Sequence, residues 1–189
     1  MQAKFIFGRA RLLAVLCVLA SVSALPAQGQ TSGGQLTVTL SVQSSISLIF
    51  QTNPASPAPG FCALTNSGTN NVGLDLGTAA FPGNNYVGCG SYTHMPGAIY
   101  QVSSAFDVVV SKANTNSPSY RLAAQISTAP PANVAWLVNN VALTNTSFTP
   151  LDAADNYGTP VTKTLQVQVK NTVPAGPLVE TITFMATAN

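Results

Sequence analysis

The chain has 189 residues, and charged side chains make up only 6% of them, with a formal net charge of +2. Three of its 7 basic residues, Lys4, Arg9 and Arg11, lie at the start of the chain, so four scattered cations remain elsewhere. Binding of nucleic acid needs a clustered basic patch, which this composition excludes.

The first 27 residues have the three parts of a secretory signal. A basic start is followed by an apolar run over 12–22 and then by small residues up to Ala24 and Ala27. The apolar run is about half the ~20 residues that a membrane-spanning helix needs. We therefore expect a signal peptide over 1–27, cleaved after Ala27 or alternatively after Ala24. The exported chain would reside in the periplasm, at the cell surface or outside the cell.

The mature part, 28–189, is predicted to be one domain without a membrane span. Four basic against five acidic side chains leave it a net charge of −1. Its polar surface must therefore consist mainly of Ser, Thr, Asn and Gln. Because so few side chains are charged, two copies of the chain repel each other only weakly, which permits self-association or contact with other surface subunits.

Apolar and polar residues alternate strictly at the start of the mature part. This period of two is typical of a strand with one buried face, and it resumes after a break at 44–45. The apolar positions are Leu36, Val38, Leu40 and Val42, then Ile46, Leu48 and Phe50. The sequence therefore predicts strands over 36–42 and 46–50, followed by a Pro-rich loop at 52–60.

Two cysteines remain once Cys17 leaves with the signal. An even number of cysteines in an oxidising compartment indicates a disulfide, here between Cys62 and Cys89. Closing a loop of that length would stabilise the domain by about 3–4 kcal/mol.

The loop around Cys89 holds the best candidate for a ligand site. Tyr86 and Tyr92 flank it, and aromatic faces of this kind could form a platform for a glycan. His94, the only histidine, is expected to be an exposed loop residue. Since a serine nucleophile needs both a base and an orienting acid, we predict no catalytic residues and no enzyme.

Further strand patterns follow at intervals along the chain. They cover 99–110, 120–126, 161–169 and 179–188, and Trp136 is expected in the core beside a tight hairpin whose turn is Asn139-Asn140. Only Lys163 breaks the apolar parity of the 161–169 pattern. About eight or nine short strands separated by turn signals predict an all-β fold, namely a β-sandwich.

The acidic residues offer little chemistry. Asp152 and Asp155 form the one acidic cluster, which could bind calcium but lacks the spacing of a calcium loop, so a solvated turn is the favoured interpretation. Asp75, Asp107 and Glu180 could act as paired catalytic carboxylates only if the fold brought them together, and Asp75 and Asp107 are expected to be outward-facing strand residues instead. We predict no metal and no cofactor.

The end of the chain carries a resemblance to a known family. Val173-Pro-Ala-Gly176, followed by alternating Thr and apolar residues over 180–189, resembles the closing segment of chaperone–usher pilins and spore-coat-U-like domains. Asp75-Leu-Gly77 and the alternating 36–42 segment resemble parts of the same domains, and the opening and ending also resemble secreted β proteins of soil bacteria.

This resemblance implies an immunoglobulin-like sandwich and, in pilins, a missing strand that a neighbour's N-terminal extension supplies. Residues 36–42 would then be either such a donor strand or the first strand of their own sandwich. We accordingly expect a secreted or cell-surface structural or adhesive protein, more specifically a fibre subunit. The alternative is a monomeric carbohydrate-binding module, and a hydrolase is least favoured.

Overall fold

The computed structural model describes residues 39–41, 45–80 and 85–189, and these residues form strands but no helix. The prediction of an all-β fold is therefore confirmed. Thirteen strands lie in the described ranges, of which eight have five residues or more and five have only two or three. None of the described residues belongs to a helix that could cross a membrane. The predicted signal peptide, 1–27, lies outside the described residues.

The larger sheet is built on two long central strands. Its order is β1-β7-β12-β9-β10, and β6 also pairs with β7. The strands are β1 (Ser45–Thr52), β6 (Ser91–Met95), β7 (Ile99–Ala113), β9 (Val134–Val138), β10 (Val141–Ala142) and β12 (Val161–Lys170). The antiparallel register of β7 and β12 runs from the pair Ile99 and Lys170 to the pair Val108 and Val161. Alternating apolar residues on both strands give this sheet one continuous buried face.

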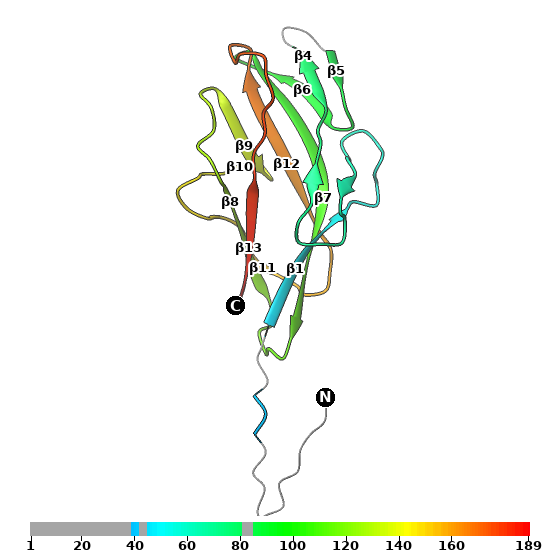
Figure 1. Ribbon diagram of the computed structural model, residues 1–189, viewed down its shortest axis with the longest axis vertical. Coiled ribbons are helices and arrows are strands. Elements are labelled where there is room, and N and C mark those ends of the chain that lie inside the picture. Colours follow the sequence, from blue (N-terminus) through cyan, green and yellow to red (C-terminus); the bar gives the residue numbers. More distant parts are fainter. Residues whose placement is uncertain (1–38, 42–44, 81–84) are drawn as a thin grey trace, which may run out of the picture. The chain divides into compact units, whose positions relative to one another are not determined.

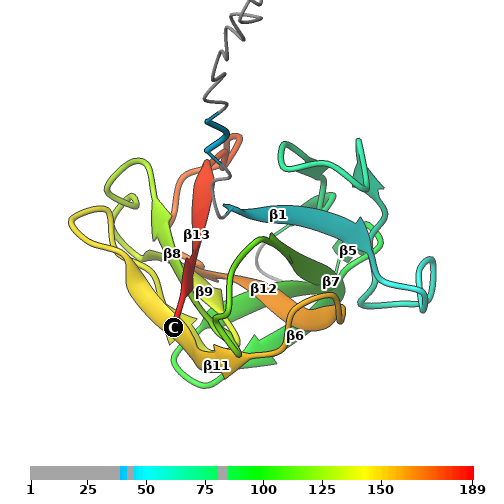
Figure 2. The same cartoon turned by 90° about the horizontal axis from the view of Figure 1, so that it is seen from below.

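A second sheet of three strands contains β8 between β11 and β13. The strands are β8 (Tyr120–Ile126), β11 (Thr149–Asp155) and β13 (Ile182–Ala188), all antiparallel to their neighbours. Its apolar face packs against that of the larger sheet (Figures 1 and 2), in keeping with the predicted β-sandwich. The rings of Phe50, Phe106 and Phe184 meet in this core, with centroids 5.2–6.1 Å apart.

The remaining four strands form two short two-stranded ribbons. They are β2 (Leu64–Thr65) with β3 (Gly73–Leu74), and β4 (Thr78–Ala80) with β5 (Asn85–Val87). The predicted disulfide joins Cys62, just before β2, to Cys89, just after β5. It therefore ties the two ribbons together.

The predicted hairpin is also present. Val141 pairs with Val138, and the two turn residues, Asn139 and Asn140, have φ of 51° and 66°. Asparagine tolerates this left-handed region better than most residues, which explains why the pair favours a two-residue turn.

Only residues 39–41 of the predicted strand over 36–42 lie within the described part of the chain. Leu40 belongs to no strand and its side chain is 86% exposed. Leu36, Val38 and Val42 lie outside the described residues. The first strand that the structure describes is thus β1, which matches the second half of the alternating pattern.

Candidate functional site: the seam between β1 and β13

Two strand edges that face one another carry no ladder among the described residues. β13 pairs with β8 on one side only, and β1 pairs with β7. The two strands nevertheless approach one another at one end and diverge along their length (Figures 1 and 2). We call these two edges and the apolar side chains along them the seam.

The backbone of β13 presents hydrogen-bonding groups to the seam. Ser127 N donates a hydrogen bond to Thr181 O (2.9 Å). Continued along the register of the two strands, this bond means that the odd-numbered residues of β13 direct their backbone N–H and C=O groups toward β8. Backbone groups of successive strand residues point to alternate sides. The N–H and C=O groups that point into the seam are therefore those of Ile182, Phe184 and Ala186.

The backbone of β1 does the same from the other side. Phe50 N donates to Thr69 O (2.8 Å), away from β7, so even-numbered residues of β1 face outward. The loop at 66–69 covers this edge at Phe50, whereas the described chain offers no partner to the backbone of Ile46 and Leu48. Within the described residues, both edges of the seam thus present backbone groups without a ladder partner.

The side chains of the same residues make the seam apolar. Five of them pack against the core yet stay half-buried. They are Ile46, Leu48, Ile182, Phe184 and Ala186. A half-buried apolar row beside two unpaired edges is the arrangement that proteins normally cover.

An apolar cleft lies on the same face of the larger sheet. Its volume is about 760 Å³, and its floor includes the register neighbours Val102, Val167 and Trp136. Residues 76–80 form one wall and residues 173–178, which lead into β13, form the other. Trp136 is 8% exposed, so its predicted place in the core is correct, and it also lines the cleft.

Glu180 fastens the start of β13 to the end of β8. Its carboxylate accepts hydrogen bonds from the backbone and hydroxyl groups of Ser127 and Thr128 and from Thr181 N (2.9 Å). Burial raises the pKa of Glu180, but these hydrogen bonds outweigh it and lower the pKa below its usual value. This carboxylate therefore positions one edge of the seam.

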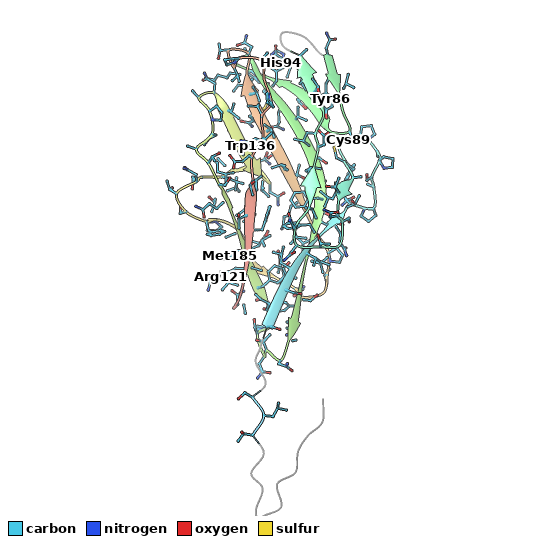
Figure 3. All side chains as sticks on the ribbon, in the orientation of Figure 1. Tyr86, Cys89, His94, Arg121, Trp136 and Met185 are labelled. Atoms are coloured by element: carbon cyan, nitrogen blue, oxygen red, sulfur yellow. A yellow bond between two sulfur atoms is a disulfide. The ribbon has the colours of Figure 1, made fainter. Side chains whose placement is uncertain are left out.

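The structure brings Tyr86 and Tyr92 together, but with their faces covering one another. The rings stack with centroids 5.4 Å apart, and Tyr92 in turn stacks on Tyr100 at 6.0 Å. The Tyr86 hydroxyl donates to Leu76 O and accepts from Gly90 N (2.7 Å). Tyr86 lies close to Cys89 of the disulfide (Figure 3), and its stacking on Tyr92 occupies ring surface that a glycan would need.

His94 lies on a strand rather than in the predicted loop. It is exposed on β6, opposite Tyr100, and its ring stacks on that tyrosine at 4.7 Å. The pattern of β6 was obscured by the Gly and Pro residues on both sides of it.

The acidic cluster is not the solvated turn that the sequence favoured. Asp152 and Asp155 lie half-buried on β11, and Lys163 from β12 reaches them across the sandwich, with Nζ 2.6 Å from Asp152 Oδ2. Pro150 and two alanines give β11 a weak strand signal, and its register shifts twice along β8. The signal that could have revealed the cluster was Lys163 itself, at an inward position.

The remaining acids make separate structural contacts. Asp75 accepts from Gly77 N (2.9 Å), and the buried Asp107 accepts from Asn53 Nδ2 (2.8 Å) and Thr162 Oγ1 (2.7 Å). Asp107 alternates with the inward Phe106 and Val108, so it lies on the outward side of β7 as predicted, but it is buried there. Within the described ranges, no three or more His, Cys, Asp or Glu side chains gather as metal ligands would.

Comparisons with known proteins identify no relative: no family model, no curated protein and no solved structure matches the chain. The class of protein is therefore defined by the fold and the seam alone, as an all-β protein in whose described residues two strand edges beside an apolar row carry no ladder.

Proposed function

We propose that this protein is an exported structural or adhesive subunit, an immunoglobulin-like sandwich that assembles by accepting a strand of a neighbouring copy into the seam. The observation that supports this proposal is that, in the part of the chain that the structure describes, the facing edges of β1 and β13 carry no ladder. A strand that pairs with the free edge of β13 or of β1 would gain a ladder of hydrogen bonds and would cover the half-buried apolar row beside that edge.

The chain contains a segment suited to this position. Residues 36–42 alternate apolar and polar side chains, so one face of an inserted strand would point into the core. Burying Leu36, Val38, Leu40 and Val42 would contribute about 6–10 kcal/mol, at 1.5–3 kcal/mol for each side chain. That gain is comparable to the stability of a whole domain.

Donation to a neighbour is favoured over folding back onto the same chain. A two-residue hairpin between 36–42 and β1 would call for Gly, Asn or Asp, and residues 36–50 contain none of these and no Pro. The segment therefore has the composition of a continuous extension that leads into β1.

The test compares the mature chain with a truncated chain that lacks residues 28–43. We expect the mature chain to form oligomers in size-exclusion chromatography, and the truncated chain to be a folded monomer. A peptide of residues 35–44 should bind the truncated chain and raise its melting temperature. The matched control is the same peptide with Val38→Asp and Leu40→Asp, which should have no effect. A mature chain that is a stable monomer and ignores the peptide would contradict the proposal.

The carbohydrate-binding alternative has less support, because Tyr86 and Tyr92 cover each other's faces. A glycan that binds the wild-type chain and not the Tyr92→Ala variant would favour that alternative over assembly.

A further inference from the structure

One lysine and two aspartates meet between the two sheets. The Lys163 side chain is 2% exposed, and its Nζ lies 2.6 Å from Asp152 Oδ2 and 3.7 Å from Asp155 Oδ2. Lys163 belongs to β12 in the larger sheet, and both aspartates belong to β11 in the second sheet. This contact therefore spans the sandwich.

The surroundings of Lys163 are largely apolar, whereas the side chains of Asp152 and Asp155 are 20% and 22% exposed. Phe106 is the register partner of Lys163 and is buried. Tyr120 is the partner of Asp155, is 0% exposed, and its hydroxyl has no hydrogen-bond partner in the part of the chain that the structure describes. Burial, followed by the charges of Asp155 and Asp152, raises the pKa of Tyr120 to about 12. Ions in such a place gain little net stability, because removing them from water offsets their attraction.

We propose that Lys163 and Asp152 condense to form an intramolecular amide that links β12 to β11. The Lys163 nitrogen attacks Asp152 Cγ, a C–N bond forms, and one C–O bond of the carboxyl group breaks. The ammonium gives up two protons, which leave with the carboxyl oxygen as one water molecule. No oxidant, metal or second substrate is needed. The inference is independent of the proposed assembly.

Asp155 is placed to carry the protons. It accepts a proton from the ammonium, which frees the amine for attack, and returns protons to the departing oxygen of Asp152. Burial, and then the negative charge of Asp152, raise the pKa of Asp155, so this carboxyl group holds a proton more readily than an exposed one. Packing keeps the reacting groups in contact, which converts a slow bimolecular condensation into a step within one folded chain.

The decisive measurement is the intact mass of the folded, incubated protein after reduction of the disulfide and denaturation. We expect a mass lower than that of the unlinked chain by one water molecule. A Lys163→Arg variant keeps the charge but cannot form the amide, and it should have the full mass. The matched control, Lys170→Arg at the exposed end of the same strand, should keep the deficit. Full mass for the wild-type chain after prolonged incubation would overturn the proposal.

Peptide mapping locates the link. Trypsin does not cleave after an amide-bonded lysine, so a peptide of residues 122–170 should replace those of 122–163 and 164–170. Further cleavage before Asp155 should leave 122–154 and 155–170 joined as one mass. A succinimide also loses one water molecule but does not join the two peptides. Peptides 122–154 and 155–170 that separate despite the water loss would therefore indicate a succinimide and refute the link. An Asp155→Asn variant should form the link many times more slowly, and an unchanged rate would remove Asp155 from the reaction.

Discussion

β8 and β13 are neighbours in one sheet, yet their inward side chains differ in burial. β8 has a strand on each side, and its inward residues Tyr120, Leu122, Ala124 and Ile126 are all 1% exposed or less. Among the described residues β13 has a strand on one side only, and its inward residues Ile182, Phe184 and Ala186 remain half-buried. Both strands face the same larger sheet.

The difference shows that composition does not decide burial in this sheet. Ile126 and Ile182 are the same residue type and are register partners, so they differ mainly in the presence of a strand on the far side. The absent neighbour is what leaves an apolar row accessible along the seam. The contrast between β8 and β13 can be tested by substitutions that affect one of the two strands and not the other.

The largest effect is expected from the cluster that anchors β11, the outer neighbour of β8. In freshly folded chain, before any amide forms, Lys163→Ala removes the only cation that contacts Asp152 and Asp155 in the described structure, and leaves two partly buried carboxylates without a counterion. We expect a loss of about 3–5 kcal/mol in the free energy of unfolding, measured by urea denaturation. Lys170→Ala, at an exposed position, should change it by less than about 0.5 kcal/mol. Equal effects of the two substitutions would show that the cluster does not hold the sheets together.

The second prediction compares the two isoleucines directly. Ile126→Ala should lower the free energy of unfolding by about 2–5 kcal/mol, because it leaves a cavity at a fully buried site. Ile182→Ala should cost less than half as much in the monomer, since solvent already reaches that side chain. Urea denaturation of both variants, with and without the 35–44 peptide, measures the difference. If the peptide leaves the cost of Ile182→Ala unchanged, the seam is not its binding site.

The smallest effect concerns the carboxylate that joins the two strands. The lowered pKa of Glu180 means that its contribution is fully present above its ordinary pKa of 4.5 and is lost as the pH falls through the lowered value. Wild-type protein should therefore be more stable than Glu180→Gln at neutral pH, with the difference shrinking in acid. Melting temperatures of both proteins between neutral and acidic pH measure this. If the stability difference between wild type and Glu180→Gln grew as the pH fell, the pKa of Glu180 would be raised rather than lowered, which would contradict the account.

The regular parts of the fold could be predicted from the sequence because their signals are local. Alternation identified β7, β8 and β12, the Asn139-Asn140 pair identified the hairpin, and the cysteine count identified the disulfide. β11 was missed because Pro150 and its alanines have low strand propensity and its pairing with β8 is irregular.

The seam and the lysine cluster could not be predicted in the same way, because both depend on contacts between distant parts of the chain. Nothing in the residues of β13 tells whether a strand lies beyond it, since its alternation resembles that of β8. Lys163 at an inward position signalled a buried partner, but only the packing of β12 against β11 shows that Asp152 is that partner.

Residue-resolved amide hydrogen exchange of β13 in the truncated monomer tests the open seam most directly. The account predicts alternation: the amides of Thr183 and Met185, which face β8, should exchange slowly, and those of Phe184 and Ala186, which face the seam, should exchange quickly. Adding the 35–44 peptide should slow exchange at Phe184 and Ala186 and leave Thr183 and Met185 as they were. Protection of Phe184 and Ala186 in the free monomer, or no change on adding the peptide, would contradict the account.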